Sequence, residues 1–114
     1  MPKSELVRLR HMLEAAEEAV AFAAQRQRDE LDTDRMLSLA LVKLIETIGE
    51  AASRVPPETQ QHYSQIPWSD IVGMRHHLVH GYAEIDLDIV WQVIQQDLPP
   101  LVKELKKALS SSIT

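Results

Sequence analysis

Apolar residues recur at a helical period along most of this chain, and this pattern limits its fold more than any other feature. From residue 4 to residue 30 they fall every three or four positions among charged side chains, which predicts one long amphipathic helix. A second stripe predicts a helix capped by Asp32 or Thr33 that runs to about Val55, where two prolines end it. The residues of the two stripes are Leu6, Leu9, Leu13, Ala16, Val20 and Ala23, followed by Leu37, Leu41, Leu44, Ile45, Ile48 and Ala52.

The second half of the chain continues this pattern in shorter segments. Residues 57 to 66 are expected to form a short connection with one helical turn. A third helix is expected to begin near Pro67, which suits a first helical position, and to end close to Gly81. Asp86 is the predicted cap of a fourth helix. The pair Pro99-Pro100 should kink or split that helix, because proline removes an intrahelical hydrogen bond.

These segments predict an all-α fold. No alternating strand pattern of useful length and no internal repeat interrupts the helical periodicity. We expect an antiparallel up-and-down bundle of four main helices, formed by a single domain over residues 1–114, with residues 110–114 as a frayed tail. The apolar surface of the first two helices exceeds what one small bundle can cover, so that a homodimer is expected.

Composition narrows the possible chemistry. The chain has no cysteine, which excludes disulfides, thiol nucleophiles and thiolate metal sites. Neither a signal core nor an apolar run of about 20 residues is present, so that a cytoplasmic protein without a membrane partner is expected. The net charge of −5 argues against broad, non-specific binding of nucleic acid, because such binding needs many basic side chains. Any RNA chemistry must therefore depend on a local site.

Arg75, His80 and Tyr82 bring a fixed cation, a group that titrates near neutral pH and a phenol together within eight residues. Arg75 lies in the apolar stripe of the predicted third helix, where a charge must be paired or must open onto a cleft. A structural interpretation pairs it with a carboxylate of a neighbouring helix, and Glu50 is the candidate. Tyr82 continues the same stripe and also fits a core aromatic residue with its hydroxyl at the rim.

His80 has several interpretations. Five residues of ideal helix would turn it about 140° from Arg75 and move it about 7.5 Å along the axis, so that the two side chains would not meet. They converge if Gly81 loosens the helix end, or if a second subunit brings its own copies into one groove. A histidine near a helix end also fits a capping role. A third interpretation is a metal site of His76, His77 and His80, although no glutamate follows the first histidine as it does in helical metalloprotease motifs.

Several short motifs together resemble a known family. They are Ile48-Gly49-Glu50-Ala51, Ile66-Pro67-Trp68, Gly73-Met74-Arg75, Leu78-Val79-His80-Gly81-Tyr82, Asp86-Leu87-Asp88, Trp91 and Asp97-Leu98-Pro99. Over roughly residues 35 to 105 the chain is similar to HepT-like proteins, the HEPN-domain toxins of the HEPN/MNT toxin–antitoxin systems. The spacing of an arginine, four residues, a histidine, one residue and a tyrosine is short, but the flanking motifs make the match specific.

The resemblance implies a dimeric helical bundle that cleaves RNA without a metal ion or another cofactor. It assigns the active site to Arg75 and His80, with His76 as the polar residue that follows the arginine, and Glu50 is expected to support Arg75. The implied partner is a minimal nucleotidyltransferase antitoxin, which silences the toxin by transferring AMP to Tyr82. A tRNA or an mRNA is the expected substrate. The alternative is a non-catalytic helical module that only binds the transferase.

Overall fold

The computed structural model describes residues 3–80 and 84–113, with His80 and residues 111–113 described by their backbone alone. Three long helices form the frame of the molecule: α1 (Lys3–Ala23), α3 (Arg35–Ser53) and α7 (Leu98–Ile113). The shorter elements are α2 (Glu30–Thr33), α4 (Pro57–His62), α5 (Trp68–Met74), the 3₁₀ turn η1 (Arg75–His77), the strands β1 (Val79–His80) and β2 (Glu84–Ile85), α6 (Leu87–Gln92) and the π-helical turn η2 (Val93–Asp97).

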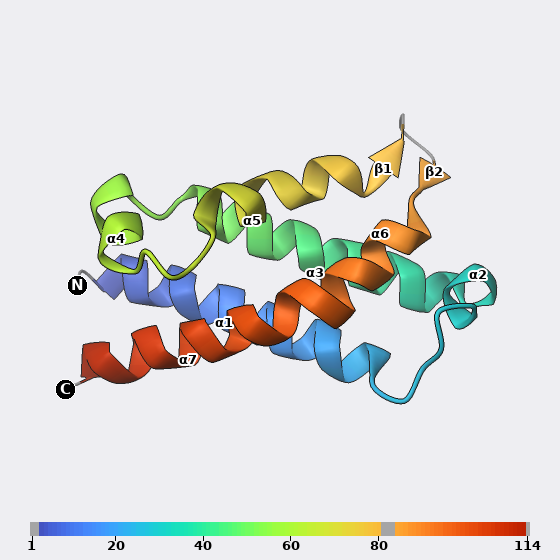
Figure 1. Ribbon diagram of the computed structural model, residues 1–114, viewed down its shortest axis with the longest axis horizontal. Coiled ribbons are helices and arrows are strands. Elements are labelled where there is room, and N and C mark those ends of the chain that lie inside the picture. The colour runs from blue at the N-terminus through green and yellow to red at the C-terminus, as the bar shows by residue number, and fades with distance from the viewer. Residues whose placement is uncertain (1–2, 81–83, 114) are drawn as a thin grey trace.

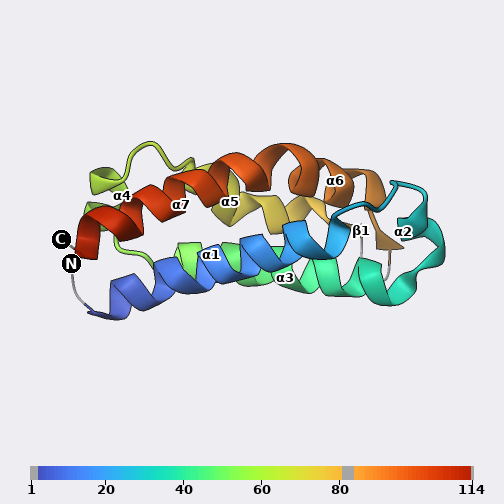
Figure 2. The same ribbon diagram turned by 90° about the horizontal axis from the view of Figure 1, so that it is seen from below.

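The helices run alternately along an elongated bundle of 45 × 30 × 20 Å (Figure 1). α1 packs against both α3 and α7, and α3 also packs against α5. In Figure 2, α1 and α3 form one layer, while α5, α6 and α7 lie in the other. The predicted all-α, antiparallel up-and-down bundle is therefore confirmed. Within the described residues, none of the helices is long and apolar enough to cross a membrane.

A single apolar core connects the two layers. The largest side chains that are fully buried are Leu9, Met12, Leu31, Leu41, Ile45, Ile48, Leu78, Val90, Ile94, Leu98 and Leu105. Four of them, Leu9, Leu41, Ile45 and Ile48, belong to the predicted stripes of α1 and α3, which explains why helical periodicity alone predicted these long helices.

The first half of the chain differs from its prediction at the end of α1. That helix ends at Ala23, not near residue 30, and Gln25 takes a left-handed conformation with a φ of 62°. The predicted capping residues Asp32 and Thr33 lie inside the short helix α2 instead. Asp34 is the residue that caps α3. One of its carboxylate oxygens accepts a hydrogen bond from the N–H of Leu37 at 3.0 Å, and the other accepts one from Nη2 of Arg26 at 2.8 Å.

The third helix is shorter than predicted. It ends at Met74, and the chain continues through η1 into a small antiparallel hairpin, in which Val79 pairs with Ile85 and His80 with Glu84. The N–H of Asp86 donates to the carbonyl of Leu78 at 2.7 Å and closes this reversal. The prediction of a helix that ends close to Gly81 was wrong here. The apolar pair at residues 78 and 79 fits a strand as well as a helix, so that periodicity did not distinguish them.

The last helix has the predicted interruption. Asp86 caps α6 by accepting the N–H of Ile89 at 3.2 Å, as expected. The helix then widens into η2 immediately before Pro99 and Pro100, where the N–H of Leu98 donates to the carbonyl of Val93. The two prolines lack the N–H groups that regular helical bonding would require, and a π-helical turn accommodates that loss. α7 continues to Ile113, over most of the segment expected to be frayed.

Candidate functional site

Arg75 is the first residue of η1, and Glu50 of α3 holds its side chain. Its Nη1 lies 2.8 Å from Oε2 of Glu50, and the two side chains are 31% and 49% exposed. The other oxygen of the same carboxylate binds Arg54, whose Nε lies 3.0 Å away. The expected partnership between Glu50 and Arg75 is confirmed, and it joins a third residue that the sequence analysis did not include.

Both arginines act on the ionisation of Glu50. The hydrogen bond from Arg75, followed by that from Arg54, lowers the pKa of this carboxyl group below its ordinary value, because both favour its charged form. Glu50 therefore remains a carboxylate at neutral pH. The guanidinium of Arg75 has N–H donors beyond the one that Glu50 occupies.

Gly49 brings the backbones of α3 and α5 together beside this pair. A Cβ atom at Gly49 would lie 3.3 Å from the carbonyl oxygen of Ile71 and 3.5 Å from Cδ of Arg75. The absence of a side chain at this position allows the close approach of α5 to α3. Residue 75 consequently lies directly over the next residue of α3, Glu50.

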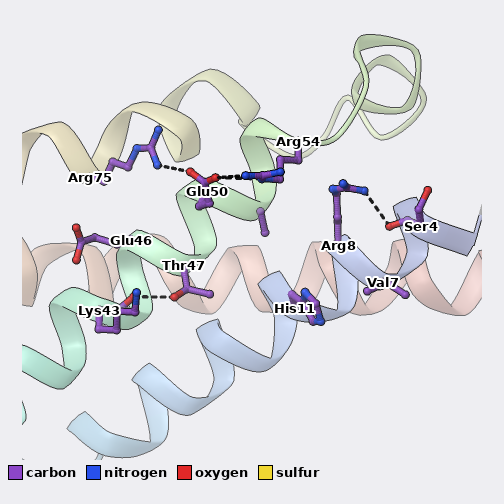
Figure 3. Close-up of a pocket in the computed structure, with 11 residues that line it drawn as sticks. Ser4, Val7, Arg8, His11, Lys43, Glu46, Thr47, Glu50, Arg54 and Arg75 are labelled. Atoms are coloured by element: carbon purple, nitrogen blue, oxygen red, sulfur yellow. Dashed lines mark hydrogen bonds and ion pairs between the residues drawn. The ribbon is translucent and has the colours of Figure 1, made fainter.

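Arg75 also lines a groove of about 710 Å³ between α1 and α3 (Figure 3). The side chains that line it are Ser4, Val7, Arg8, His11, Lys43, Glu46, Thr47, Glu50, Ala51, Arg54 and Arg75. Figure 3 shows the guanidinium of Arg75 directed toward Glu50 from the element that follows α5, while α1 forms the opposite wall. The arrangement combines a fixed cation with an open groove.

The other predicted site residues are placed less completely. His76 follows Arg75 in η1, is exposed and is not among the residues that line the groove. The backbone of His80 pairs with Glu84 in the hairpin, which shows that this residue is not at a helix end; its side chain lies outside the described part of the structure. Tyr82 lies outside the described residues altogether.

The break after α5 changes the spatial relation of Arg75 and His80. The rotation of about 140° that a regular helix would impose does not apply, because the chain passes through η1 and β1 between them. At a rise of about 2.0 Å per residue in a 3₁₀ turn and about 3.3 Å in a strand, their Cα atoms are no more than about 13 Å apart. That spacing is compatible with side chains that act on one phosphodiester from two sides.

The metal interpretation finds no support among the described side chains. No group of three His, Cys, Asp or Glu residues within them is arranged to hold a metal ion. The side chains of His76 and His77 are among those described, whereas that of His80 is not.

Sequence reasoning did not identify the residues of the groove on α1. Arg8 and His11 line the same groove as Lys43 and Arg54 because α1 packs against α3, which is a contact between distant parts of the chain. The spacing of Glu50 and Arg54, one helical turn apart, was a local signal that could have placed Arg54 beside Glu50.

Comparison with known families decides the relationship that the motifs suggested. A family model described as Ribonuclease HepT-like matches residues 12–108, which is more than four-fifths of the chain. The chain belongs to this HepT-like family. The expectation of a HepT-like ribonuclease is thus confirmed at the level of the family, and the roles of individual residues stay predictions.

Similar proteins come from archaea and bacteria. One, from Caldanaerobacter subterraneus subsp. tengcongensis, bears the name "putative RNase" and is 33% identical over 89% of this chain and 90% of its own length. Another, from Thermococcus cleftensis, is named "probable ribonuclease HepT" and is 27% identical over 94% of this chain and 97% of its own.

A third relative is a longer protein. The "gamma-glutamylcyclotransferase and putative RNase" of Methanocaldococcus jannaschii is 33% identical over 96% of this chain, which spans about half of that protein's length. No solved structure gives a significant match to the chain.

Proposed function

We propose that this HepT-like protein is the toxin of a type VII-like HEPN/MNT toxin–antitoxin system and cleaves RNA without a metal ion. The observation that carries the proposal is the position of Arg75: a motif residue held by Glu50 at the edge of an open groove, in a chain whose family is described as ribonuclease. The names of two relatives point to the same activity.

The proposed reaction uses the 2′-hydroxyl of the substrate as nucleophile. His80 removes the 2′ proton, the 2′ oxygen attacks the adjacent phosphorus, and the bond between phosphorus and the 5′ oxygen breaks. A second histidine returns a proton to the leaving 5′ oxygen, and in a homodimer this is His80 of the other copy. The products are a 2′,3′-cyclic phosphate and a 5′-hydroxyl.

Arg75 stabilises the negative charge that develops on the phosphorane. Its planar guanidinium presents donors that match phosphate oxygens. Glu50 occupies one nitrogen and limits the rotation of the side chain, so that the remaining donors are oriented before substrate binds. Removal of one such stabilising donor from an active site typically lowers the rate about 10²-fold to 10³-fold.

Control by the antitoxin follows from the position of Tyr82 in the motif. The partner is proposed to be a minimal nucleotidyltransferase that transfers AMP to the hydroxyl of Tyr82. The added phosphate and nucleoside would introduce negative charge and bulk two residues from His80, where substrate phosphate must bind. A tRNA or an mRNA is the proposed substrate.

The competing function is a non-catalytic helical module that binds the transferase. It is favoured by one observation, the ion pair of Arg75 with Glu50, because such a pair also fits a purely structural arginine.

The decisive experiment is cleavage of total cellular RNA by the purified protein in EDTA, beside the His80→Ala variant. We expect cleavage by the wild type alone, with 2′,3′-cyclic phosphate ends. Equal cleavage by both proteins would contradict the role of His80. A wild type without activity, once mass spectrometry has shown Tyr82 to be free of AMP, would favour the binding module.

A further inference from the structure

We propose that the groove between α1 and α3 binds the phosphate backbone of the RNA strand and leads it to Arg75. This inference deepens the proposed ribonuclease function and rests on it. It assigns a binding role to Arg8, Lys43 and Arg54, which lie outside the motif that indicated the site.

The charge of the groove is opposite to that of the rest of the chain. Its lining contains four Lys or Arg residues and two Glu residues, an excess of two positive charges. The remainder of the chain has eight Lys or Arg residues and 15 Asp or Glu residues, an excess of seven negative charges. A polyanion would therefore be repelled by most of the surface and attracted here, because the low-dielectric walls of a groove concentrate the local potential.

The cations of the groove are available for a ligand. Lys43 is exposed and has no ion pair among the described residues. Among the described residues, the side chain of Arg8 donates to the carbonyl of Ser4 alone, at a long 3.4 Å. Arg54 shares the single carboxylate of Glu50 with Arg75. In a structural ion-pair network, each cation would bind one or more carboxylates of its own. Among the described residues, Lys43 and Arg8 bind none, and Arg54 shares one.

The cations are spaced along the groove and not gathered at one point. Lys43 and Glu50 lie on one face of α3, seven residues apart, and Arg54, the residue that ends the helix as its C-cap, follows four residues later. From Lys43 to Arg54 the helix rises about 16 Å, which matches about five nucleotides at the ~3.4 Å rise of a stacked strand. A single phosphate ion would not require cations at both ends of such a length, whereas a strand has a phosphate at every step.

The second wall supports the same occupant. Arg8 and His11 face the groove from α1, one helical turn apart, opposite the residues of α3 (Figure 3). Arg75 closes the arrangement from η1, next to the hairpin that holds the backbone of His80. A strand lying between α1 and α3 would thus reach Arg75 along a lining in which Lys and Arg residues outnumber the carboxylates.

The test separates binding from cleavage. The probe is a short, fluorescently labelled RNA oligonucleotide that is fully 2′-O-methylated, because it lacks the nucleophile of the proposed reaction and stays intact. Its affinity is measured by fluorescence anisotropy over a range of salt concentrations. The variants are Lys43→Gln in the groove and Lys103→Gln as the matched control, an exposed lysine of α7 outside the groove.

We expect Lys43→Gln to weaken binding roughly fivefold and to lower the salt slope by about 0.7, the value for one phosphate contact on a single strand. Arg8→Gln should act in the same way, and Lys103→Gln should leave both quantities unchanged. Equal affinities and slopes for Lys43→Gln, Arg8→Gln and the wild type would overturn the inference. The inference would also be overturned if these variants no longer formed dimers but bound RNA like the wild type. The groove would then hold a second copy of the chain.

The result is independent of the cleavage assay. If the wild type cleaves nothing in EDTA but the groove variants lose affinity as expected, the proposed nuclease fails and the RNA groove stands. If the wild type cleaves RNA and the groove variants bind like the wild type, the nuclease stands and the groove fails.

Discussion

Glu50 binds Arg75 through one oxygen, at 2.8 Å, and Arg54 through the other, at 3.0 Å. One carboxylate of α3 thereby orients an arginine of the motif and an arginine of the groove at the same time. The arginines are not equivalent, because Arg75 is 31% exposed and Arg54 is 61% exposed. The pair of Glu50 and Arg75 is accessible enough to meet a substrate, which makes its contribution to the fold small and its contribution to function testable.

The substitution Arg75→Ala separates a catalytic from a structural arginine. We expect the melting temperature to change by no more than a few degrees, because a solvent-accessible ion pair adds little to stability and Glu50 keeps Arg54. RNA cleavage, in contrast, should fall about 10²-fold or more. Thermal unfolding and a cleavage assay on the same preparation check both quantities. The structural interpretation would be favoured if Arg75→Ala had a much lower melting temperature and the wild type itself cleaved no RNA.

Glu50→Ala and Arg54→Gln are expected to act on different kinetic constants. Loss of Glu50 frees the side chain of Arg75, so that kcat should fall about tenfold or more with a smaller effect on KM, because the donors are no longer oriented in the transition state. Arg54→Gln leaves the bond between Glu50 and Arg75 in place and removes a groove cation, so that KM should rise instead. Steady-state cleavage of a labelled RNA measures the two constants. Identical profiles for the two variants would show that Glu50 does not position Arg75.

Much of the fold, but only part of the site, followed from local sequence signals. The stripes of α1 and α3 and the cap at Asp86 depend on residue type and spacing within one element. The pairing of Arg75 with Glu50 joins residues 25 positions apart, and it was predicted because a charge in an apolar stripe needs a partner. The groove depends on the packing of α1 against α3, across more than 30 residues of sequence, and no local pattern encodes that contact.

The end of the third helix was missed for a different reason. Arg75 lies in an apolar stripe that continues through Leu78 and Val79, and this pattern agrees with a helix over its whole length. The chain leaves the helix because residues 79 and 80 find strand partners at 84 and 85. The pairing of the two strands of this hairpin thus ends the helix that the apolar periodicity predicts.

Gly49 and Gly73 provide a matched pair for testing how α5 is positioned. A valine at Gly49 would contact the carbonyl of Ile71 and force α5 away from α3, which should cost about 1–3 kcal/mol and reduce cleavage as Arg75 is displaced. An added Cβ at Gly73 meets no atom within 4 Å, so that Gly73→Ala should stabilise the helix by up to about 1 kcal/mol. Urea denaturation measures both free energies. Stabilisation by Gly49→Val would show that the close approach does not depend on the glycine.

Tyr82→Phe tests control by AMP transfer. The variant keeps the aromatic ring and loses the acceptor hydroxyl, so that we expect an active ribonuclease that the transferase and ATP no longer silence. Tyr63→Phe is the matched control, because the chain has two tyrosines and this variant should still be silenced. Residual RNA cleavage is measured after incubation with the transferase, with mass spectrometry to detect added AMP. Full silencing of Tyr82→Phe would assign the modification to another residue.

The pH dependence of stability should depend in part on Asp34, which caps α3. The hydrogen bond from the N–H of Leu37, followed by that from Arg26, lowers the pKa of Asp34 below its ordinary value of about 3.9. A carboxyl group with a lowered pKa in the folded state stabilises the fold above about pH 4, and this contribution is lost as the pH falls through the folded-state pKa.

Asp34→Asn keeps an oxygen that can cap the helix but removes the charge. The variant should therefore be less stable than the wild type at pH 7, and the difference should shrink as the pH falls well below 4. Denaturation curves at several pH values measure it. Asp29→Asn is the control, since this exposed carboxylate has no ion pair among the described residues and its loss should change the stability at pH 7 only slightly. A difference between Asp34→Asn and the wild type that persists unchanged in acid would show that the charge of Asp34 does not stabilise the start of α3.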